Sequence, residues 1–244
     1  MNYRDKLYSK YISAHTSCFS GEVNLNNIKK PFPIWWRCYG RFLPKDKNIQ
    51  IIDLGCGTGG FVYWLQQIGY QNSAGIDISI EQIAVANKIE IKNIHQADLK
   101  EFLRDKRNFY DIIFMRDVIE HFTKEEIIDV FDCIYQALKT GGVVVVQTPN
   151  AESPFSGRFR YGDFTHEISF AEGSIRQVLG VSDFKGIRVF PTRPVVHGFK
   201  SFFRAILWRG IEIILQIYLL IETGSAKGIF TQNIIAVAEK TSQQ

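Results

Sequence analysis

Short apolar runs alternate with segments of helical spacing along most of this chain. Runs rich in Ile and Val suit strands covered on both faces, and apolar residues three or four positions apart suit amphipathic helices. The pattern predicts strands at 48–54, 73–77, 93–97, 112–115, 143–146, 185–190 and 232–239. It predicts helices at 61–68, 80–89, 100–106, 123–139 and 169–181. Repeated alternation of strand and helix indicates an α/β fold with a parallel, doubly wound sheet and right-handed crossovers.

The first strand runs into a glycine-rich turn, Asp53-Leu54-Gly55-Cys56-Gly57-Thr58-Gly59-Gly60. Glycine at alternate positions lets a ligand lie directly on the backbone, and the helix that follows places the turn at a helix N-terminus. Three of these glycines also fit the dinucleotide pattern G-x-G-x-x-G, which leaves an NAD-dependent oxidoreductase as an alternative. The carboxylate of Asp53 favours another ligand, because it repels a pyrophosphate and attracts a group with an ammonium and a sulfonium.

At this turn the sequence resembles the class I S-adenosylmethionine-dependent methyltransferases, whose first motif is D-x-G-x-G-x-G. Asp53, Gly55, Gly57 and Gly59 match that motif. The resemblance implies a Rossmann-like, doubly wound, mostly parallel seven-stranded sheet with an antiparallel last strand. It also implies S-adenosyl-L-methionine as the cofactor. The expected cofactor-binding residues are Asp53, Gly55, Cys56, Gly57, Gly59, Asp77, Ile78, Asp98, Leu99 and Arg116.

Acidic residues end the second and third predicted strands. Asp77 ends the second strand, where a carboxylate can accept hydrogen bonds from both hydroxyls of a ribose. It can instead be only the N-cap of the following helix. Asp98 follows the third strand, and the resemblance implies that it accepts the exocyclic amine of adenine beside the apolar edge of Leu99. The residues alone equally allow Asp98 to cap the helix at 100–106.

The fourth predicted strand ends in a polar cluster, Arg116-Asp117-Val118-Ile119-Glu120-His121-Phe122. The apolar run before it places this strand centrally in the sheet, with the cluster at the edge where ligands bind. The cluster resembles the E-H-F/V segment of the ubiquinone-biosynthesis-like O-methyltransferase branch. That resemblance implies that Arg116 lies near the methionine end of the cofactor and that His121 faces the active site. Histidine ordinarily titrates near neutrality and suits proton transfer, although His121 can also have a structural place at a helix end.

Regular structure is predicted to stop between residues 151 and 173, and a loop of this length in a compact domain usually has a function. The loop follows the fifth strand, so it can fold over the pocket mouth. Its arginines, aromatic residues, acid and His166 can stack on sugars, pair with phosphates and move protons. Pro149-Asn150 and Gly162-Asp163-Phe164-Thr165-His166 resemble bacterial methyltransferases encoded with surface-polysaccharide genes. His121 and His166 are therefore both candidates for the catalytic base, with a backbone-bonded, structural His166 as the alternative.

No metal site is predicted. Glu120, His121, His166 and Glu167 carry suitable ligand atoms, but their separation in the sequence leaves their convergence unproven. Metal independence is therefore the expectation. The four cysteines form no C-x-x-C pair, which argues against a zinc site or a disulfide framework and suits a reducing compartment. They are Cys18, Cys38, Cys56 and Cys133.

Length and composition limit the number of domains, the class of partner and the location that we expect. A chain of 244 residues with 45% hydrophobic residues can bury one substantial core. We expect a single domain with an N-terminal helical lid at 1–47, a cofactor-binding core at 48–150, and the substrate loop, a helical insertion and the last strands at 151–244. A net charge of +4 without a basic cluster gives no reason to expect nucleic acid. The start of the chain has no apolar core of signal-peptide length, so we expect a cytoplasmic protein.

The insertion, residues 195–224, has apolar residues at helical spacing over 199–221. Charged residues interrupt it, so it contains no apolar run of about 18 residues and a transmembrane helix is not expected. Burial against the domain, or against a second subunit of a homo-oligomer, is one interpretation. The other is an interfacial helix pair with Lys200, Arg204 and Arg209 beside lipid headgroups, which would place the protein at the inner face of a membrane.

Together these patterns predict an S-adenosylmethionine-dependent methyltransferase that acts on a hydroxyl oxygen. The loop and the amphipathic insertion favour a sugar hydroxyl in a surface-polysaccharide or lipid-linked glycan precursor. A small phenol or quinone-like acceptor is the enzymatic alternative. A non-catalytic module that binds the cofactor and the NAD-dependent oxidoreductase are the remaining alternatives.

Overall fold

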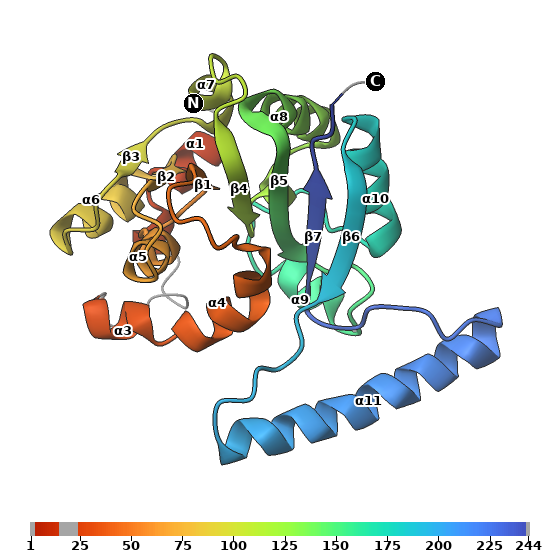
Figure 1. Ribbon diagram of the computed structural model, residues 1–244. Helices are drawn as coiled ribbons and strands as arrows, with labels where there is room; N and C mark the ends of the chain where they lie inside the picture. The colour runs from red at the N-terminus through yellow and green to blue at the C-terminus, as the bar shows by residue number, and fades with distance from the viewer. Residues whose placement is uncertain (1–2, 15–23, 243–244) are drawn as a thin grey trace.

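A seven-stranded sheet with helices on both faces forms the centre of the molecule (Figure 1). The computed structural model describes residues 3–14 and 24–242, and the following statements concern these residues. The strand order is β3-β2-β1-β4-β5-β7-β6. The strands are β1 (Ile51–Leu54), β2 (Ser73–Asp77), β3 (Ile94–Gln96), β4 (Tyr110–Arg116), β5 (Leu138–Pro149), β6 (Lys185–Pro191) and β7 (Asn233–Glu239). The seven predicted strands are confirmed.

The direction of the strands defines the edge at which a ligand can bind. β1 pairs in parallel with β2 and β4, and β7 runs antiparallel to both β5 and β6. The predicted antiparallel last strand and the central place of β4 are therefore confirmed. The chain winds outward from β1 in one direction and from β4 in the other, so these two strands flank the switch point of the sheet. Open α/β sheets bind ligands outside the carboxyl ends of the strands at such a point.

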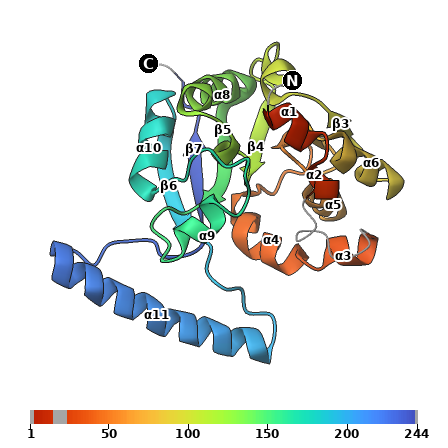
Figure 2. The ribbon, with the colours of Figure 1, turned by 180° about the vertical axis from the view of Figure 1, so that it is seen from behind.

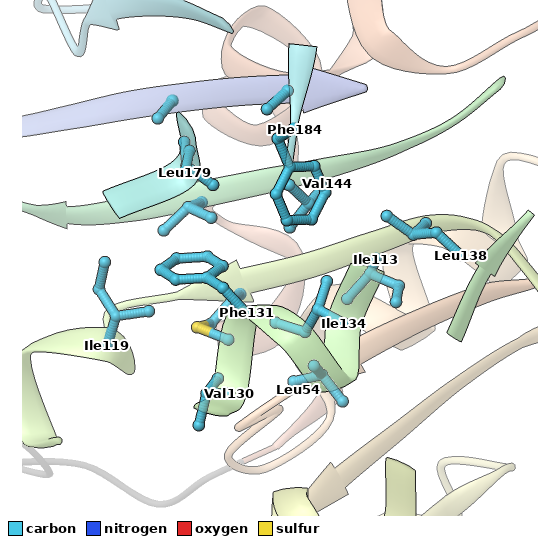
Figure 3. Close-up of a cluster of buried hydrophobic side chains, with 14 of the residues drawn as sticks. Leu54, Ile113, Ile119, Val130, Phe131, Ile134, Leu138, Val144, Leu179 and Phe184 are labelled. Atoms are coloured by element: carbon cyan, nitrogen blue, oxygen red, sulfur yellow. The ribbon is translucent and has the colours of Figure 1, made fainter. Parts of the chain in front are cut away.

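Alternate residues of the central strands pack on opposite faces of the sheet. In β4, Ile113 and Met115 belong to one buried cluster, whereas Ile112 and Phe114 belong to another. Figure 3 shows the first cluster, to which helix α8 (Lys124–Ala137) contributes Phe131. Burial on both faces explains the uninterrupted apolar runs in the sequence. Each large apolar side chain buried in this way stabilises the fold by about 1.5–3 kcal/mol.

The helices between the strands lie where the sequence predicts them, with ends that differ by up to three residues. They are α5 (Gly60–Gln67), α6 (Ile80–Lys88), α7 (Leu99–Leu103), α8 (Lys124–Ala137) and α10 (Glu172–Val181). Thr123 caps α8 as expected, in a capping box with Glu126. The predicted end of this helix at Lys139 is wrong, because β5 begins at Leu138. Gly141, expected after the helix, lies inside β5 with φ +80°, where the pairing of β4 with β5 shifts register.

The N-terminal part is helical, as expected. It comprises α1 (Tyr3–Tyr8), α2 (Tyr11–Ala14), α3 (Leu25–Lys29), α4 (Phe32–Tyr39) and the 3-10 turn η1 (Gly40–Phe42). A second 3-10 turn, η2 (Ile119–His121), follows β4. The aromatic residues of α4 pack against the core: the ring centroid of Trp35 lies 5.4 Å from that of Phe61 in α5. Cys38, Cys56 and Cys133 are free thiols. The predicted break at Gly21 and the fourth cysteine, Cys18, lie outside the described residues.

The loop between β5 and α10 is more ordered than expected. It contains the short helix α9 (Ser156–Arg160), and Asn150 at its start forms a parallel bridge with Phe170 near its end. The side-chain amide of Asn150 also donates hydrogen bonds to the carbonyls of Ile229 and Thr231. Both ends of the loop are thereby held against the sheet.

The insertion before β7 forms one long helix, α11 (Phe199–Thr223), which stands away from the sheet in both views (Figures 1 and 2). Ser201 and Glu212 are its buried residues, and most of its large apolar side chains are exposed. The expected burial against the domain and the expected helix pair are therefore wrong. Across residues 3–14 and 24–242, no helix is both long and apolar enough to cross a membrane.

Candidate active site

A cavity of about 380 Å³ opens at the carboxyl ends of β1 to β4, at the switch point of the sheet. Twelve residues were expected at the site from the sequence, and the cavity brings together the seven that follow: Gly55, Gly57, Asp77, Ile78, Asp98, Leu99 and His121. The other five lie outside its lining: Asp53, Cys56, Gly59, Arg116 and His166.

The glycine-rich turn exposes bare backbone to the cavity. Gly55 and Gly57 both have positive φ angles, +70° and +57°. A Cβ on Gly55 would lie 2.4 Å from Cγ2 of Val118, so this position accepts no side chain without a shift of that neighbour. The backbone N–H of Gly57 donates to Oδ2 of Asp77 at 2.9 Å and ties the turn to the end of β2.

Asp77 lines the cavity, and each of its carboxylate oxygens already accepts one hydrogen bond. One oxygen accepts from Gly57, and the other accepts from the backbone N–H of Ser79 at 2.8 Å. Each oxygen keeps a further lone pair for a ligand hydroxyl. Burial raises the pKa of Asp77, and these two N–H groups oppose the rise. The N-cap of α6 is Ser79, so the interpretation of Asp77 as only a cap does not hold.

Asp98 both caps a helix and lines the cavity, so the two roles that the sequence left open are compatible. It is the N-cap of α7, where its side chain accepts from the backbone N–H of Glu101 at 3.0 Å. It also lines the cavity together with Leu99 and Ile78. A polar acceptor beside two apolar side chains is an arrangement that suits a purine ring with an exocyclic amine.

Asp53 and Arg116 pair with each other outside the cavity lining. Asp53 is fully buried, and its Oδ2 lies 3.0 Å from Nη2 of Arg116. The guanidinium of Arg116 also lies over the ring of Phe61, 4.0 Å from its centroid. Burial raises the pKa of Asp53, and the Arg116 charge opposes that rise. Arg116 already supplies an opposite charge to Asp53, so the charge of Asp53 alone does not account for the attraction of a cationic ligand. Binding of the cofactor by Asp53 stays a prediction.

Two further residues of the turn are structural. The buried side chain of Cys56 fills the space beside Gly75 in β2, where a Cβ would lie 2.8 Å from its Sγ atom. Gly59, with φ +76°, is the N-cap of α5.

His121 lies in a hydrogen-bonded chain that orients its ring. Its Nδ1 is 2.8 Å from Oγ1 of Thr165, and that hydroxyl donates to Oδ1 of Asp163 at 2.6 Å. Because the hydroxyl proton goes to Asp163, Nδ1 of His121 carries a proton and donates to Thr165. The other ring nitrogen, Nε2, then bears the lone pair that can accept a proton. Burial lowers the pKa of His121 to about 4, so the ring is neutral at pH 7.

His166 lies behind His121 rather than on the cavity. Its Nδ1 donates to the backbone carbonyl of Phe159 at 2.9 Å, as the structural alternative for this residue expected. The two imidazole rings meet edge to face, with 4.7 Å between their centroids. Of the two histidines that the sequence offers as the base, His121 lines the cavity and His166 does not.

Glu120 is a buried carboxyl group beside these histidines. Its Oε2 accepts from the hydroxyl of Thr148 at 3.1 Å, and among the described residues Oε1 finds no hydrogen-bond partner. Burial raises the pKa of Glu120 well above its usual range. Ligand atoms of Glu120, His121 and His166 lie within 4.8 Å of one another, so these three side chains can hold a divalent cation. Glu167, the fourth residue considered from the sequence, instead pairs with Arg4.

The helices α1 and α2 contribute to the lining of the cavity; the sequence predicted a helical lid at 1–47 but named none of its residues as site residues. Arg4, Tyr8 and Tyr11 line the cavity. Arg4 pairs with Glu126 of α8 at 2.8 Å, and the hydroxyl of Tyr11 donates to Asp163 at 2.9 Å. The spacing gave part of the signal, because Arg4 and Tyr8 lie four positions apart on one face of α1, whereas Tyr11 begins the next helix.

Asp117 is another residue of the cavity that the sequence placed only within a polar cluster. It adopts φ +55°, an uncommon backbone conformation for a residue with a side chain. Side-chain amides of Gln147 and Asn233 donate to its two oxygens at 2.8 and 3.2 Å. These bonds hold a carboxylate at the end of β4, between the glycine-rich turn and His121.

This fold and this cavity define a class I S-adenosylmethionine-dependent methyltransferase. A model of the family described as "Methyltransferase domain" matches residues 36–188, which is more than half of the chain. The protein belongs to this family.

Curated relatives carry several different activities in their names. The chain is 28% identical over 166 residues to a tRNA U34 carboxymethyltransferase of Helicobacter acinonychis, covering 62% of each protein. It is 34% identical over 114 residues to a ubiquinone biosynthesis O-methyltransferase of Pelagibacter ubique, covering 43% of each. It is 27% identical over 113 residues to phosphoethanolamine N-methyltransferase 3 of Arabidopsis thaliana, covering 43% of this chain and 23% of the relative. Less than two thirds of each relative is matched.

Solved structures support the fold. A SAM-dependent methyltransferase from Archaeoglobus fulgidus superposes with a TM-score of 0.68 at 19% identity, covering 94% of this chain and 99% of that one. Phosphoethanolamine N-methyltransferase 2 of Haemonchus contortus, in complex with phosphomonomethylethanolamine and S-adenosylhomocysteine, gives a TM-score of 0.65 at 19% identity. That match covers 99% of this chain and 61% of the other.

Proposed function

We propose that this protein transfers the methyl group of S-adenosylmethionine to a hydroxyl oxygen, with His121 as the base. One observation carries the proposal: a single cavity is lined by Asp77 and Asp98 at one end and by His121, whose imidazole is oriented by Thr165, at the other. A nucleoside cofactor bound at Asp77 and Asp98 brings its reactive group toward His121.

In this proposal the cofactor binds at the carboxyl ends of β1, β2 and β3. The oxygens of Asp77 accept the ribose hydroxyls, and Asp98 accepts the adenine amine while Ile78 and Leu99 pack on the ring. Gly55 and Gly57 let the ligand lie on the backbone of the turn. The methionine part then extends toward the end of β4. Arg116 was expected near the methionine part of the cofactor. It contributes indirectly, because it pairs with the buried carboxylate of Asp53.

The chemistry requires alignment and the removal of one proton. The acceptor oxygen forms a bond to the methyl carbon as the carbon–sulfur bond breaks, and its proton passes to Nε2 of His121. The sulfur loses its positive charge in the same step in which the imidazole gains one, so the net charge of the cavity is conserved. Thr165 and Asp163 stabilise the imidazolium that forms. This compensation allows a base whose pKa is lowered by burial to accept the proton.

The acceptor we propose is a sugar hydroxyl of a surface-polysaccharide or lipid-linked glycan precursor. The loop between β5 and α10 supplies both Thr165 and Asp163 to the base, so it adjoins the acceptor end of the cavity. It presents Phe155, Tyr161 and Phe164, which are 74%, 79% and 82% exposed. Exposed aromatic faces beside arginines suit the apolar faces of sugar rings and the phosphates of an activated glycan.

A small phenol or quinone-like acceptor is the second candidate. The name of the Pelagibacter ubique relative, a ubiquinone biosynthesis O-methyltransferase, favours it. The same base and cofactor site serve either acceptor, so the difference lies in what the loop between β5 and α10 binds.

Calorimetric titration of the purified protein with S-adenosylmethionine tests the first step, and absence of binding at high cofactor concentration contradicts the proposal. Formation of S-adenosylhomocysteine with a panel of nucleotide sugars, lipid-linked glycans and catechols tests the second. Turnover with catechols alone selects the phenol candidate. Tight binding with no turnover on any acceptor indicates a non-catalytic module.

A further inference from the structure

The helix α11 carries a broad apolar face that no part of the described chain covers. Phe199, Leu207, Ile214 and Ile221 are 79%, 68%, 67% and 81% exposed. Residues of an α-helix follow one another at about 100°, so these side chains lie within one sector of roughly 80°. Exposed apolar surface of this extent marks a contact with a protein or a membrane.

The opposite side of α11 carries its buried polar residues. Ser201 and Glu212 face the rest of the chain. Glu212 lies 3.0 Å from both Arg193 and Arg209, so the acid in the middle of the helix is turned inward and neutralised. The outward face consequently keeps its apolar character from the first turn to the last.

Basic residues border the apolar face. Lys200 and Arg204 lie along one border, which Glu222 continues near the end of the helix. Arg209, which pairs with Glu212, lies along the other border. The side chains of Lys200, Arg204, Arg209 and Glu222 are exposed. Residues 193–228 contain five basic and two acidic side chains. An apolar face bordered by basic side chains is the pattern of a helix that lies in the plane of a membrane surface. Phosphate headgroups of lipids complement the charges of Lys200 and Arg204.

The connections of α11 place this face on the same side as the cavity. β6 is parallel to β5, and it ends at the edge of the sheet where the cavity opens. β7 begins at that edge, so both connections of α11 attach there. Figure 1 shows the helix lying beyond these strand ends. A helix of 25 residues is roughly 37 Å long, enough to hold one edge of the sheet along a surface.

We propose that α11 lies flat on an anionic lipid surface, with its phenylalanine and isoleucine side chains between the headgroups and Lys200 and Arg204 on lipid phosphates. The membrane faces the edge of the sheet that carries the cavity. This interaction goes beyond the proposed methyl transfer and does not depend on it.

Co-sedimentation of the full chain with vesicles tests the proposal. The protein pellets with vesicles of phosphatidylcholine and phosphatidylglycerol, less with phosphatidylcholine alone, and the difference shrinks as salt rises. The double variant Ile214→Glu/Ile217→Glu loses roughly tenfold or more of this affinity. Val181→Glu makes the same kind of change at a 64% exposed position of α10 and keeps full binding. The double variant Lys200→Gln/Arg204→Gln lowers binding to anionic vesicles toward the level of neutral ones.

Folding is checked separately by circular dichroism and urea unfolding, which these exposed substitutions leave unchanged. Equal pelleting by the wild-type chain and the Ile214→Glu/Ile217→Glu variant overturns the proposal. So does a stable dimer that this variant dissociates and that does not bind vesicles, which assigns the face to a second copy. Vesicle binding with no methyl transfer leaves the membrane contact intact and counts only against the proposed function.

Discussion

The Nδ1 atom of His121 lies 2.8 Å from the hydroxyl oxygen of Thr165, a residue of the loop that follows the fifth strand. This contact fixes which ring nitrogen is protonated, and it links the polar end of β4 to the segment that we assign to the acceptor. The neutral ring is the form that accepts a proton, and burial keeps it neutral down to a pH of about 4.

The pH dependence of kcat/KM follows from that lowered pKa. Activity falls as the pH drops through about 4, where His121 becomes protonated, and not through 6.5, the ordinary value for histidine. Thr165→Val removes the acceptor for the Nδ1 proton and lowers kcat by roughly 10²-fold, whereas Thr165→Ser keeps the hydroxyl and most of the activity. Rates measured from about pH 3 to pH 9 check this, and an acidic limb near 6.5 that Thr165→Val leaves in place contradicts it.

Asp77 and Asp98 should affect cofactor binding to different extents. Asp77→Asn leaves one backbone N–H without an acceptor and weakens hydrogen bonds to the ribose, so we expect a roughly 10- to 100-fold higher Kd for S-adenosylmethionine. Asp98→Asn still caps α7, because asparagine is an equally good N-cap, and weakens binding by no more than about tenfold. Calorimetry gives both constants. Unchanged affinity in Asp77→Asn would remove the ribose assignment.

The pair formed by Asp53 and Arg116 should govern stability. Removing Arg116 alone, as in Arg116→Met, leaves a buried carboxylate without a partner and costs about 3–5 kcal/mol of unfolding free energy. The double variant Asp53→Asn/Arg116→Met recovers part of that loss, because the uncompensated charge is gone. Urea unfolding of the single and double variants measures the coupling. If Asp53→Asn abolishes cofactor binding at full stability, Asp53 contacts the cofactor directly.

Metal removal separates two possible uses of Glu120, His121 and His166. With His121 as the base, turnover survives dialysis against a chelator, since no step of the proposed transfer uses a metal. The measurement is the rate of S-adenosylhomocysteine formation before and after dialysis. Loss of activity that one divalent cation restores would show that the three side chains hold a metal and that His121 is not free to act as the base.

Much of this fold is predictable from local pattern. The strands follow from apolar runs, the glycine-rich turn from its motif, and Asp77 and Asp98 from their places at strand ends. These features depend on residues close in sequence. The partner of Asp53 does not, because Arg116 reaches it from a neighbouring strand.

Longer-range contacts account for what the sequence left open. The choice between His121 and His166 depends on how a loop folds back on η2, and the convergence with Glu120 depends on the same fold. The helical character of α11 is evident from its spacing, but its exposure is not. Apolar periodicity indicates that one face of a helix will be covered. It does not indicate which segment or molecule covers that face, because this depends on how the whole chain folds.

The central claim is methyl transfer with His121 as the base. It is tested most directly by supplying S-adenosylmethionine with an isotopically labelled methyl group to the wild-type chain, His121→Gln and His166→Gln, each with the acceptor panel. We expect label in the acceptor with the wild-type chain, roughly 10²-fold less with His121→Gln at an unchanged cofactor Kd, and a smaller loss with His166→Gln. No labelled acceptor from the wild-type chain, or full turnover by His121→Gln, would contradict the account.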